Sequence, residues 1–270
     1  MSRVDARRAS APVEGLHARE PLSALVTTKN EEPSIRACLE SLRWADEVVV
    51  VDSGSTDGTL AIARSIADRV LEHPYENPAA QKNWALGELT HSWTLILDAD
   101  ERVTPELRRE IESVLADPSR RDGYWIRREN WFYGRPIQNA GWQRDKVLRL
   151  FDRRKGAYRP VLVHEEVELQ GQVDRLKARL VHEPYRDLDQ YFEKWSRYSR
   201  WSAEELRRRG VSASAYYLLF RPWLRFARMY VLEGGFREGR RGIVLCWLAA
   251  FSVFTKYARL WGDEMREGKR

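Results

Sequence analysis

A short apolar run that ends in closely spaced carboxylates constrains the fold of this chain more than any other feature. Leu95, Ile96 and Leu97 are followed directly by Asp98 and then by Asp100. This pattern predicts a buried strand whose carboxyl end carries two carboxylates, and open α/β sheets bind their ligands at that end. Because Mg²⁺ usually sits between one or two carboxylates and substrate phosphates, the pair predicts a metal site for a phosphorylated substrate. The plainer alternative is a solvated loop that leads into a capped helix.

Two further apolar runs end in polar loops in the same way. Residues 22–28 predict a strand that opens the domain, followed by a polar loop at 29–33 and a helix over about 34–42. Residues 47–52 predict a second strand, which leads through a turn of glycine and hydroxyl residues into a helix that begins near Thr59. Runs this apolar are typical of parallel strands covered by helices on both faces. We therefore predict an α/β fold with three ligand-binding loops at one sheet edge.

Together, three segments resemble the family 2 glycosyltransferases of the GT-A fold. They are Thr27 to Glu31, Val51 to Thr59 and Leu97 to Glu101, and they keep the family's order and spacing over about residues 20 to 115. The resemblance is closest to the bacterial lipopolysaccharide inner-core β-1,4-glucosyltransferases and their relatives. It implies a mostly parallel nucleotide-binding sheet flanked by helices, with a C-terminal helical extension.

The resemblance also implies which residues bind the nucleotide of a nucleotide-sugar donor. Asp52 is expected to face the nucleobase, Thr27 and Glu31 to line the same uridine pocket, and Asn30 to belong to this donor-binding set. Two alternatives remain open: Asp52 only caps the turn that follows it, and Glu31 is a solvated charge at a helix entry. The chain departs from many relatives at Lys29, where they carry an aromatic residue, so stacking on the base from that position is not expected.

Diphosphate and metal contacts follow from the same resemblance. Asp98 is expected to face the ribose and, with Asp100, the metal-bound diphosphate. Lys82, in a helix predicted over about 77–86, would contact a phosphate or sugar oxygen; its alternative is an exposed helical lysine. His182 is expected to join Asp100 around the ion, the alternative being a half-buried histidine bonded to backbone. The implied cofactor is Mg²⁺ or Mn²⁺, and an imidazole ligand favours Mn²⁺.

Inverting sugar transfer needs a base that deprotonates the acceptor hydroxyl. In family 2 the base is usually a carboxylate in a short acidic motif on the acceptor side, and the pair Glu165 and Glu166 stands where that motif is expected. We favour Glu165 as the catalytic base and place Glu166 second. The reason is that strand alternation puts Glu166 and Glu168 on one solvent-facing side.

Charged residues are distributed unevenly along the chain. Residues 190–270 hold 17 lysines and arginines against 8 acidic residues, together with five of the eleven tryptophans and six of the eight phenylalanines. They predict three helices, over about 188–209, 213–233 and 237–262. The predicted organisation is a disordered tail over 1–20, a GT-A catalytic domain over 21–189 with a nucleotide-sugar half (21–118) and an acceptor half (119–189), and a basic amphipathic helical extension over 190–270.

Amphipathic helices that carry arginine, tryptophan and phenylalanine suit an anionic membrane interface. The longest apolar stretch, residues 243–255, spans 13 residues, fewer than the roughly 20 that cross a bilayer. Cys38 and Cys246 are far apart in sequence and predict no disulfide framework, which favours a reducing cytoplasm. We expect a peripheral protein on the inner face of the cytoplasmic membrane. The alternative is that these helices pack on the catalytic domain or form a homodimer.

These inferences give one leading function and two rivals. The leading function is metal-dependent, inverting transfer of a sugar, expected to be glucose, from a UDP-sugar to a lipopolysaccharide core or related envelope glycan, presented as a saccharide or on a lipid. The first rival is a catalytically silent, nucleotide-binding membrane scaffold of envelope assembly. The second is a nucleic-acid-binding protein that uses the basic extension, with steeply salt-dependent binding; we expect no nucleic-acid partner.

Overall fold

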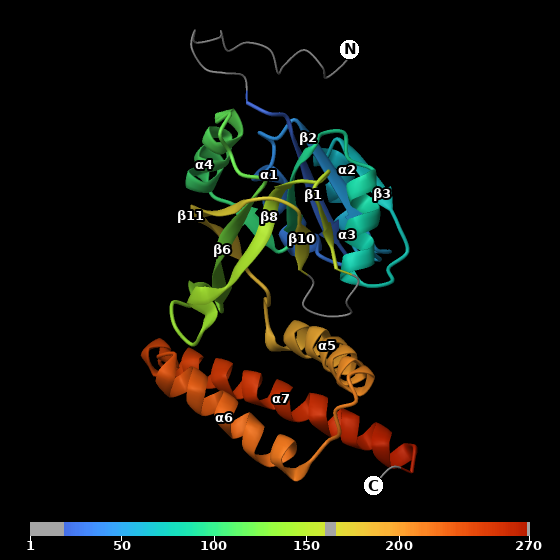
Figure 1. The fold of residues 1–270 in the computed structure, drawn as a ribbon, viewed down its shortest axis with the longest axis vertical. Helices are drawn as coiled ribbons and strands as arrows, with labels where there is room; N and C mark the ends of the chain where they lie inside the picture. The colour runs from blue at the N-terminus through green and yellow to red at the C-terminus, as the bar shows by residue number, and fades with distance from the viewer. Residues whose placement is uncertain (1–18, 160–165, 269–270) are drawn as a thin grey trace.

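The computed structural model describes residues 19–159 and 166–268 as a sheet domain followed by a helical extension (Figure 1). The strands are β1 (Leu22–Thr28), β2 (Glu47–Asp52), β3 (Arg69–Glu72), β4 (Trp93–Asp98), β5 (Glu101–Val103), β6 (Gly123–Phe132), β7 (Arg135–Pro136), β8 (Lys146–Asp152), β9 (Gly156–Tyr158), β10 (Val167–Leu169) and β11 (Val173–His182). The α-helices are α1 (Glu32–Glu40), α2 (Thr59–Ile66), α3 (Pro78–Gly87), α4 (Pro105–Ala116), α5 (Leu188–Arg208), α6 (Arg221–Ala227) and α7 (Arg240–Arg266).

Within the described ranges, nine strands form one sheet. Its order is β3-β2-β1-β4-β8-β6-β11-β5, with β7 paired to β6, and β9 and β10 form a separate two-stranded ladder. The four strands from β3 to β4 are parallel, which confirms the predicted parallel sheet for the nucleotide half. The acceptor half is mixed, since β8 runs antiparallel to both β4 and β6, whereas β6 and β11 are parallel.

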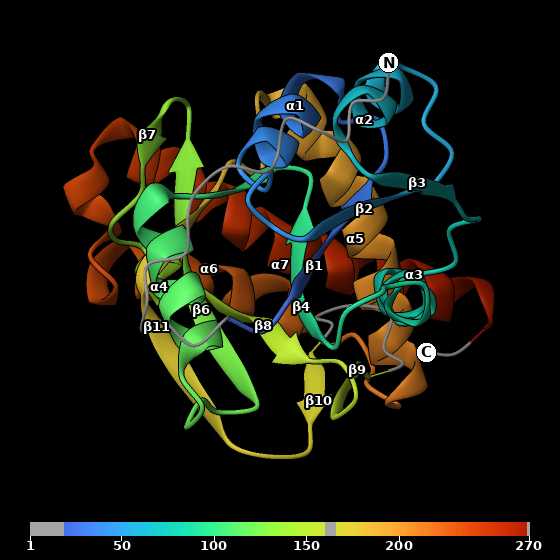
Figure 2. The ribbon, with the colours of Figure 1, turned by 90° about the horizontal axis from the view of Figure 1, so that it is seen from above.

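Helices cover both faces of the parallel strands, as the apolar runs predict. In β2, Val48 and Val50 pack in the cluster that holds α1 and α2, while Val49 and Val51 pack in the cluster that holds α3. Figure 2 shows α1 and α2 on one side of these strands and α3 on the other. Alternate residues of one strand are therefore buried in opposite directions, and no position in the run is left to face water.

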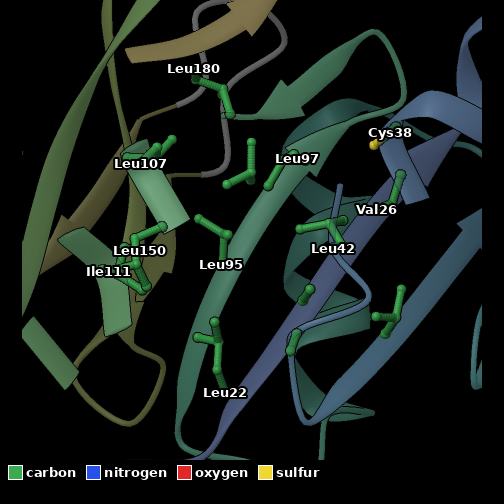
Figure 3. Close-up of a cluster of buried hydrophobic side chains, with 14 of the residues drawn as sticks. Leu22, Val26, Cys38, Leu42, Leu95, Leu97, Leu107, Ile111, Leu150 and Leu180 are labelled. Carbon is green, nitrogen blue, oxygen red and sulfur yellow. The ribbon is translucent and has the colours of Figure 1, made fainter. Parts of the chain in front are cut away.

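The larger of the two apolar layers holds the strands in place beneath the loops that follow them. Leu97 of β4 lies in this layer with Leu42, which follows α1, and with Leu107 and Ile111 of α4 (Figure 3). All four side chains are fully buried, and each contributes about 1.5–3 kcal/mol to folding. This packing fixes the position of the strand end that carries Asp98.

Local signals place most helix starts correctly. The hydroxyl of Thr104 accepts a hydrogen bond from the backbone N–H of Leu107 at 3.1 Å, and Pro105 occupies the first turn of α4. The Asn77 side chain caps α3 in the same way. The helix predicted over 34–42 instead begins at Glu32, because proline is accommodated within a first helical turn and Pro33 lies there.

The helical extension contains the three predicted helical segments. Short π-helical turns, Tyr216–Phe220 and Arg228–Leu232, flank α6 and complete the middle segment. The third segment begins and ends later than predicted, at Arg240 and Arg266. α5 lies between the sheet domain and the pair α6–α7 (Figure 1). The predicted boundary at residue 190 falls just inside α5.

One face of the extension packs on the sheet domain. Phe132 of β6 lies in one buried cluster with Met229, Leu245 and Cys246. α5 is attached to α7, since the Tyr191 hydroxyl donates a hydrogen bond to a backbone carbonyl of α7 at 3.1 Å. The alternative of packing on the catalytic domain is therefore confirmed for this face, while other parts of α6 and α7 are exposed.

Replacing Leu97 by alanine should destabilise the protein by about 2–5 kcal/mol, because it removes a fully buried side chain from the layer beneath the strand ends. Urea unfolding followed by circular dichroism measures this loss. Val173→Ala in β11 is the control: this side chain is 45% exposed, and its loss should change the free energy of unfolding by at most about 0.5 kcal/mol. Equal effects of the two substitutions would contradict the core assignment.

Candidate active site

A cavity of about 770 Å³ opens at the carboxyl ends of β1 and β4, with walls that include residues of α3, β8, β11 and α5. It lies where the sequence predicts a ligand site. The predicted residues that line it are Thr27, Glu31, Lys82, Asp98, Asp100, Glu166 and His182. The predicted base Glu165 lies outside the described residues.

Asp98 is held at the cavity by two buried cations. Lys82 Nζ lies 3.0 Å from its Oδ1, which also accepts a hydrogen bond from the Thr27 hydroxyl at 3.1 Å, and Arg149 pairs with its Oδ2. Burial alone would raise the pKa of Asp98, but Arg149 and Lys82 outweigh burial and hold it well below its usual range. Lys82 is 2% exposed, so the alternative of an exposed helical lysine is wrong.

The Asp98 pair belongs to a longer chain of alternating charges. Glu101, fully buried, lies 3.0 Å from Arg149 and 3.3 Å from Arg128. Arg128 in turn pairs with Asp145 at 2.8 Å. These buried charges are not hydrated by water, and opposite charges at these distances stabilise each other instead. The chain joins β4, β5, β6 and β8 behind the cavity and fixes the direction of the Asp98 carboxylate.

Asp100 has a different environment. Lys194 of α5 lies 3.1 Å from its Oδ2 and 3.2 Å from Glu31 Oε1. Oδ1 of Asp100 is buried without a hydrogen-bond partner, and His182 Nε2 lies 3.6 Å from it. Burial raises the pKa of Glu31 despite Lys194. Because Glu31 is buried and lines the cavity, the alternative of a solvated helix-entry charge is wrong.

His182 presents a neutral ring to Asp100. Its Nδ1 lies 2.5 Å from Asn130 Oδ1, and the Asn130 amide nitrogen donates to Asp145, so Nδ1 carries the proton and Nε2 keeps its lone pair. Burial lowers the pKa of His182, although the Asp100 charge acts in the opposite direction. The alternative of a histidine bonded to backbone is not what the structure shows.

A divalent ion fits this arrangement when a ligand contributes to its shell. Among residues 19–159 and 166–268, no three or more histidine, cysteine or acidic side chains are grouped so that they could bind a metal ion without another ligand. Asp100 offers a buried oxygen with no hydrogen-bond partner and His182 a lone pair beside it. Both oxygens of Asp98 already have partners. One carboxylate completed by phosphate oxygens is a common Mg²⁺ arrangement, so Asp100 is the best-placed first ligand.

Two predicted donor-binding residues hold the loops that surround the cavity and do not line it themselves. Asp52, fully buried, accepts hydrogen bonds from the backbone N–H of Gly54 at 2.8 Å and of Ser55 at 2.7 Å. The Asn30 side chain accepts one from the backbone of Thr56 at 2.8 Å. Turn capping, the alternative for Asp52, is therefore present, and donor contact by Asp52 or Asn30 stays a prediction.

On the acceptor side, the predicted strand alternation is confirmed. Val167 and Leu169 of β10 pack against a buried cluster, while Glu166 and Glu168 are exposed. Glu166 nevertheless lines the cavity. Glu166, the residue before β10, is thus both exposed to solvent and part of the cavity wall.

Several site residues carry no role in the sequence prediction. Lys194 comes from the extension, and Arg128 and Arg149 come from β6 and β8. An aromatic rim is also present, in which Tyr75 stacks on Trp201 with ring centroids 6.3 Å apart. Tyr75 follows the end of β3, whereas the other four positions follow no strand end of the nucleotide half and reach the cavity only through tertiary packing.

The sequence matches the family model described as "Glycosyl transferase family 2" over residues 23–159. This chain belongs to glycosyltransferase family 2. The family, together with the parallel order β3-β2-β1-β4, establishes the predicted GT-A fold. The glycosyltransferase is 33% identical to the lipopolysaccharide core biosynthesis glycosyltransferase LpsC of Rhizobium meliloti, over 88% of this chain and 93% of that protein. It is 27% identical to the uncharacterized glycosyltransferase RT0209 of Rickettsia typhi, over 88% and 86%.

Solved structures are more distant from this glycosyltransferase. S. aureus TarS 1–349 in complex with UDP aligns with a TM-score of 0.48 and 17% identity over 92% of each chain. Glucosyl-3-phosphoglycerate synthase from Mycobacterium tuberculosis, in complex with Mn²⁺, UDP and glucosyl-3-phosphoglycerate, aligns with a TM-score of 0.34 and 20% identity over 42% of this chain and 44% of that one.

The glycosyltransferase should show a His182 ring that titrates below 6.5, its ordinary pKa, because burial disfavours the imidazolium. The stability that comes from the neutral ring is present above pH 6.5 and is lost as the pH falls from 6.5 through the folded-state pKa. NMR titration of the ring protons, assigned with His182→Gln, measures this pKa. Asp100→Asn should lower it further, since the Asp100 charge favours the imidazolium; titration of His182 at or above 6.5 would refute the assignment.

Proposed function

We propose that this glycosyltransferase transfers a sugar, expected to be glucose, from a UDP-sugar to a lipopolysaccharide core or related envelope glycan, with inversion at the anomeric carbon. The observation that carries the proposal is the Asp100 carboxylate, whose buried Oδ1 has no hydrogen-bond partner and which lines a cavity at the parallel strand ends. The acceptor class is supported by the relative LpsC, which is named for lipopolysaccharide core biosynthesis and covered along 93% of its length.

The donor half holds the nucleotide diphosphate and stabilises its departure. Asp100, with His182 beside it and Asp98 behind, would hold a Mg²⁺ or Mn²⁺ ion, which supplies Lewis-acid stabilisation of the departing diphosphate. Lys82 keeps Asp98 ionised and lines the same cavity, so its ammonium favours negative charge there. Thr27 and Glu31 line the part of the donor pocket that would hold the nucleobase.

The acceptor half supplies the catalytic base. A carboxylate of the pair Glu165 and Glu166 takes the proton of the acceptor hydroxyl as that oxygen attacks the anomeric carbon, while the bond to the diphosphate breaks on the opposite face. Glu166 is exposed and lines the cavity. An ionised, solvent-accessible carboxylate is suited to accept this proton near neutral pH.

Turnover of a panel of UDP-sugars with Mg²⁺ or Mn²⁺ and a truncated lipopolysaccharide acceptor tests the proposal. We expect release of UDP and a product of inverted anomeric configuration by NMR. Glu165→Gln and Glu166→Gln are made separately; the one that removes the base should lower kcat about 10²–10⁴-fold with donor affinity nearly unchanged. Asp100→Asn should lose both transfer and metal-dependent UDP binding.

Glu168→Gln is the matched control, because Glu168 is an exposed carboxylate of β10, two residues after Glu166, and pairs with Arg159. It should leave transfer unchanged. Full activity of both Glu165→Gln and Glu166→Gln would refute the assignment of the base. UDP binding without transfer to any acceptor or water, unaffected by Asp100→Asn, would favour the silent scaffold.

We further propose that the extension binds the inner face of the cytoplasmic membrane, where a lipid-linked acceptor is presented. Around α6, large apolar side chains are 55–80% exposed among exposed arginines: Leu219, Phe220, Trp223, Leu224, Val231 and Leu232, with Arg221, Arg225 and Arg228. Apolar and cationic side chains interleaved on one segment suit the interface of an anionic bilayer.

The neighbouring helix α7 extends this surface. It is 27 residues long and apolar enough, by length and composition, to cross a bilayer, and 28% of its apolar window is buried within the protein. Its Leu245 and Cys246 pack against the sheet domain, and its Tyr257 is buried in the cluster that includes Ala203 of α5. These contacts support an interfacial position of α7, because a spanning helix would have to leave them.

Co-sedimentation with vesicles that contain phosphatidylglycerol tests the membrane proposal. Each arginine near an anionic surface contributes about 1 kcal/mol, so the double change of Arg225 and Arg228 to glutamine should weaken binding about thirtyfold. The same change of Arg108 and Arg109, exposed on α4 of the sheet domain, is the matched control and should have little effect. Equal binding by all three proteins would contradict the proposal, and a concentration-dependent dimer without vesicle binding would favour the homodimer.

A further inference from the structure

Lys194 places a cation from the extension inside the candidate donor site. It comes from α5 and lies 3.2 Å from Glu31 Oε1 and 3.1 Å from Asp100 Oδ2. Its ammonium also donates to the Pro184 carbonyl at 3.1 Å, and its side chain is 19% exposed. The two carboxylates raise its pKa although burial acts against the charge. Lys194 is therefore charged at neutral pH and held by three oxygens.

The charges around this ammonium leave little attraction for a second cation. Asp98 and Glu101 are already paired with Lys82, Arg149 and Arg128, and the His182 ring is neutral. Glu31 and Asp100 share the charge of the Lys194 ammonium, and the Arg186 charge also acts on Glu31, so much of the negative charge of these two carboxylates is already offset. A divalent ion at Asp100 would lie close to the Lys194 ammonium, which is 3.1 Å from the other oxygen of the same carboxylate. Like charges this close repel strongly when they are partly buried.

We propose that Lys194 is an internal cation that keeps divalent-ion affinity at Asp100 low until a nucleotide diphosphate enters the cavity. The inference rests on the proposed function, because it takes a diphosphate-bearing donor as the ligand. A diphosphate brings at least two negative charges and several oxygen acceptors. Both the ion and the ammonium are then neutralised, with Lys194 turned from a competitor of the metal into a donor to the diphosphate.

This role makes metal binding conditional on the donor. The ion is retained when a diphosphate is present to share it, and it is released with the nucleotide product. Asp100 keeps its Oδ1 without a hydrogen-bond partner, ready for the ion, while its Oδ2 is held by Lys194. A metal-first order of binding is disfavoured, because the ion would enter a site that already contains a cation.

Manganese binding in the absence of donor tests the proposal without measuring activity. Electron paramagnetic resonance of free Mn²⁺ gives its affinity for the full chain with and without UDP. Wild-type protein should bind Mn²⁺ weakly alone and at least about tenfold more tightly with UDP. Lys194→Met keeps the apolar stem and removes the charge, so it should bind Mn²⁺ alone at least about tenfold more tightly than wild type, with a smaller gain from UDP.

Two variants separate charge from packing. Lys194→Arg keeps the positive charge and should keep the weak Mn²⁺ affinity of the wild type. Lys256→Met removes a half-buried lysine of α7 that does not line the cavity and should also behave as wild type. Thermal unfolding of each variant checks that it is folded.

Unchanged Mn²⁺ affinity in Lys194→Met, or tight Mn²⁺ binding by wild type without nucleotide, would overturn the inference. Tight Mn²⁺ binding by wild type alone overturns the inference even if Lys194→Met fails to fold. Failure of the proposed function is a separate outcome: if wild-type protein binds Mn²⁺ but never UDP, the donor assignment falls, whereas the comparison of wild type with Lys194→Met still decides whether Lys194 opposes the metal.

Discussion

The ion pairs of Asp98 with Lys82 and Arg149 are the interaction on which the rest of the site depends. A carboxylate at the end of a buried strand is costly unless cations and hydrogen bonds offset its desolvation. Lys82 comes from α3 and Arg149 from β8, so these ion pairs join a helix on one face of the sheet to the acceptor-half strand that lies next to β4. The same guanidinium contacts Glu101, and through it Arg128. The charges therefore hold together the two halves of the catalytic domain at the edge where the cavity opens.

Asp98 and Asp100 are two residues apart and have different environments. Asp98 has both oxygens bonded to groups of the protein, whereas Asp100 has one oxygen without a hydrogen-bond partner and one shared with the extension. Asp98 is held mainly by the protein, and the ligand position that we propose lies at Asp100. This difference explains why an acidic pair at a strand end is more informative than either residue alone.

The sequence predicts the nucleotide half well because its signals are local. Apolar runs, polar loops and helix caps set β1, β2, β4 and the helices between them, and the resemblance adds their order. It does not predict the burial of Lys82, because the ion pair with Asp98 depends on how α3 packs across the sheet. Lys194 is still further from prediction: it contacts Glu31, which is 163 positions away in the numbering, and helical periodicity in α5 gives no hint of that contact. For Asp52, turn chemistry and ligand chemistry use the same residue type, so the sequence leaves the choice open.

The acceptor half shows a second limit. Its strands β8, β6 and β11 mix parallel and antiparallel pairs, and β11 pairs with β6 through a register shift between Arg175 and Arg179. An apolar run predicts a strand but does not say which strand will lie beside it or in which direction, since strands far apart in the sequence pair only once the chain has folded. The alternation in β10 was nevertheless predictable, because a two-residue period needs only neighbouring positions.

The position of α5 has a consequence for how this architecture diversifies. One surface of the helix carries Lys194 to the carboxylates, and another attaches to α7 through Tyr191 and the stacked rings of Trp195 and Phe251, 5.2 Å apart. The C-terminal region is thus not an interchangeable module. Exchanging it between related enzymes would transfer one charge of the cavity together with the exposed apolar and basic surface around α6, so the two features are expected to be inherited together.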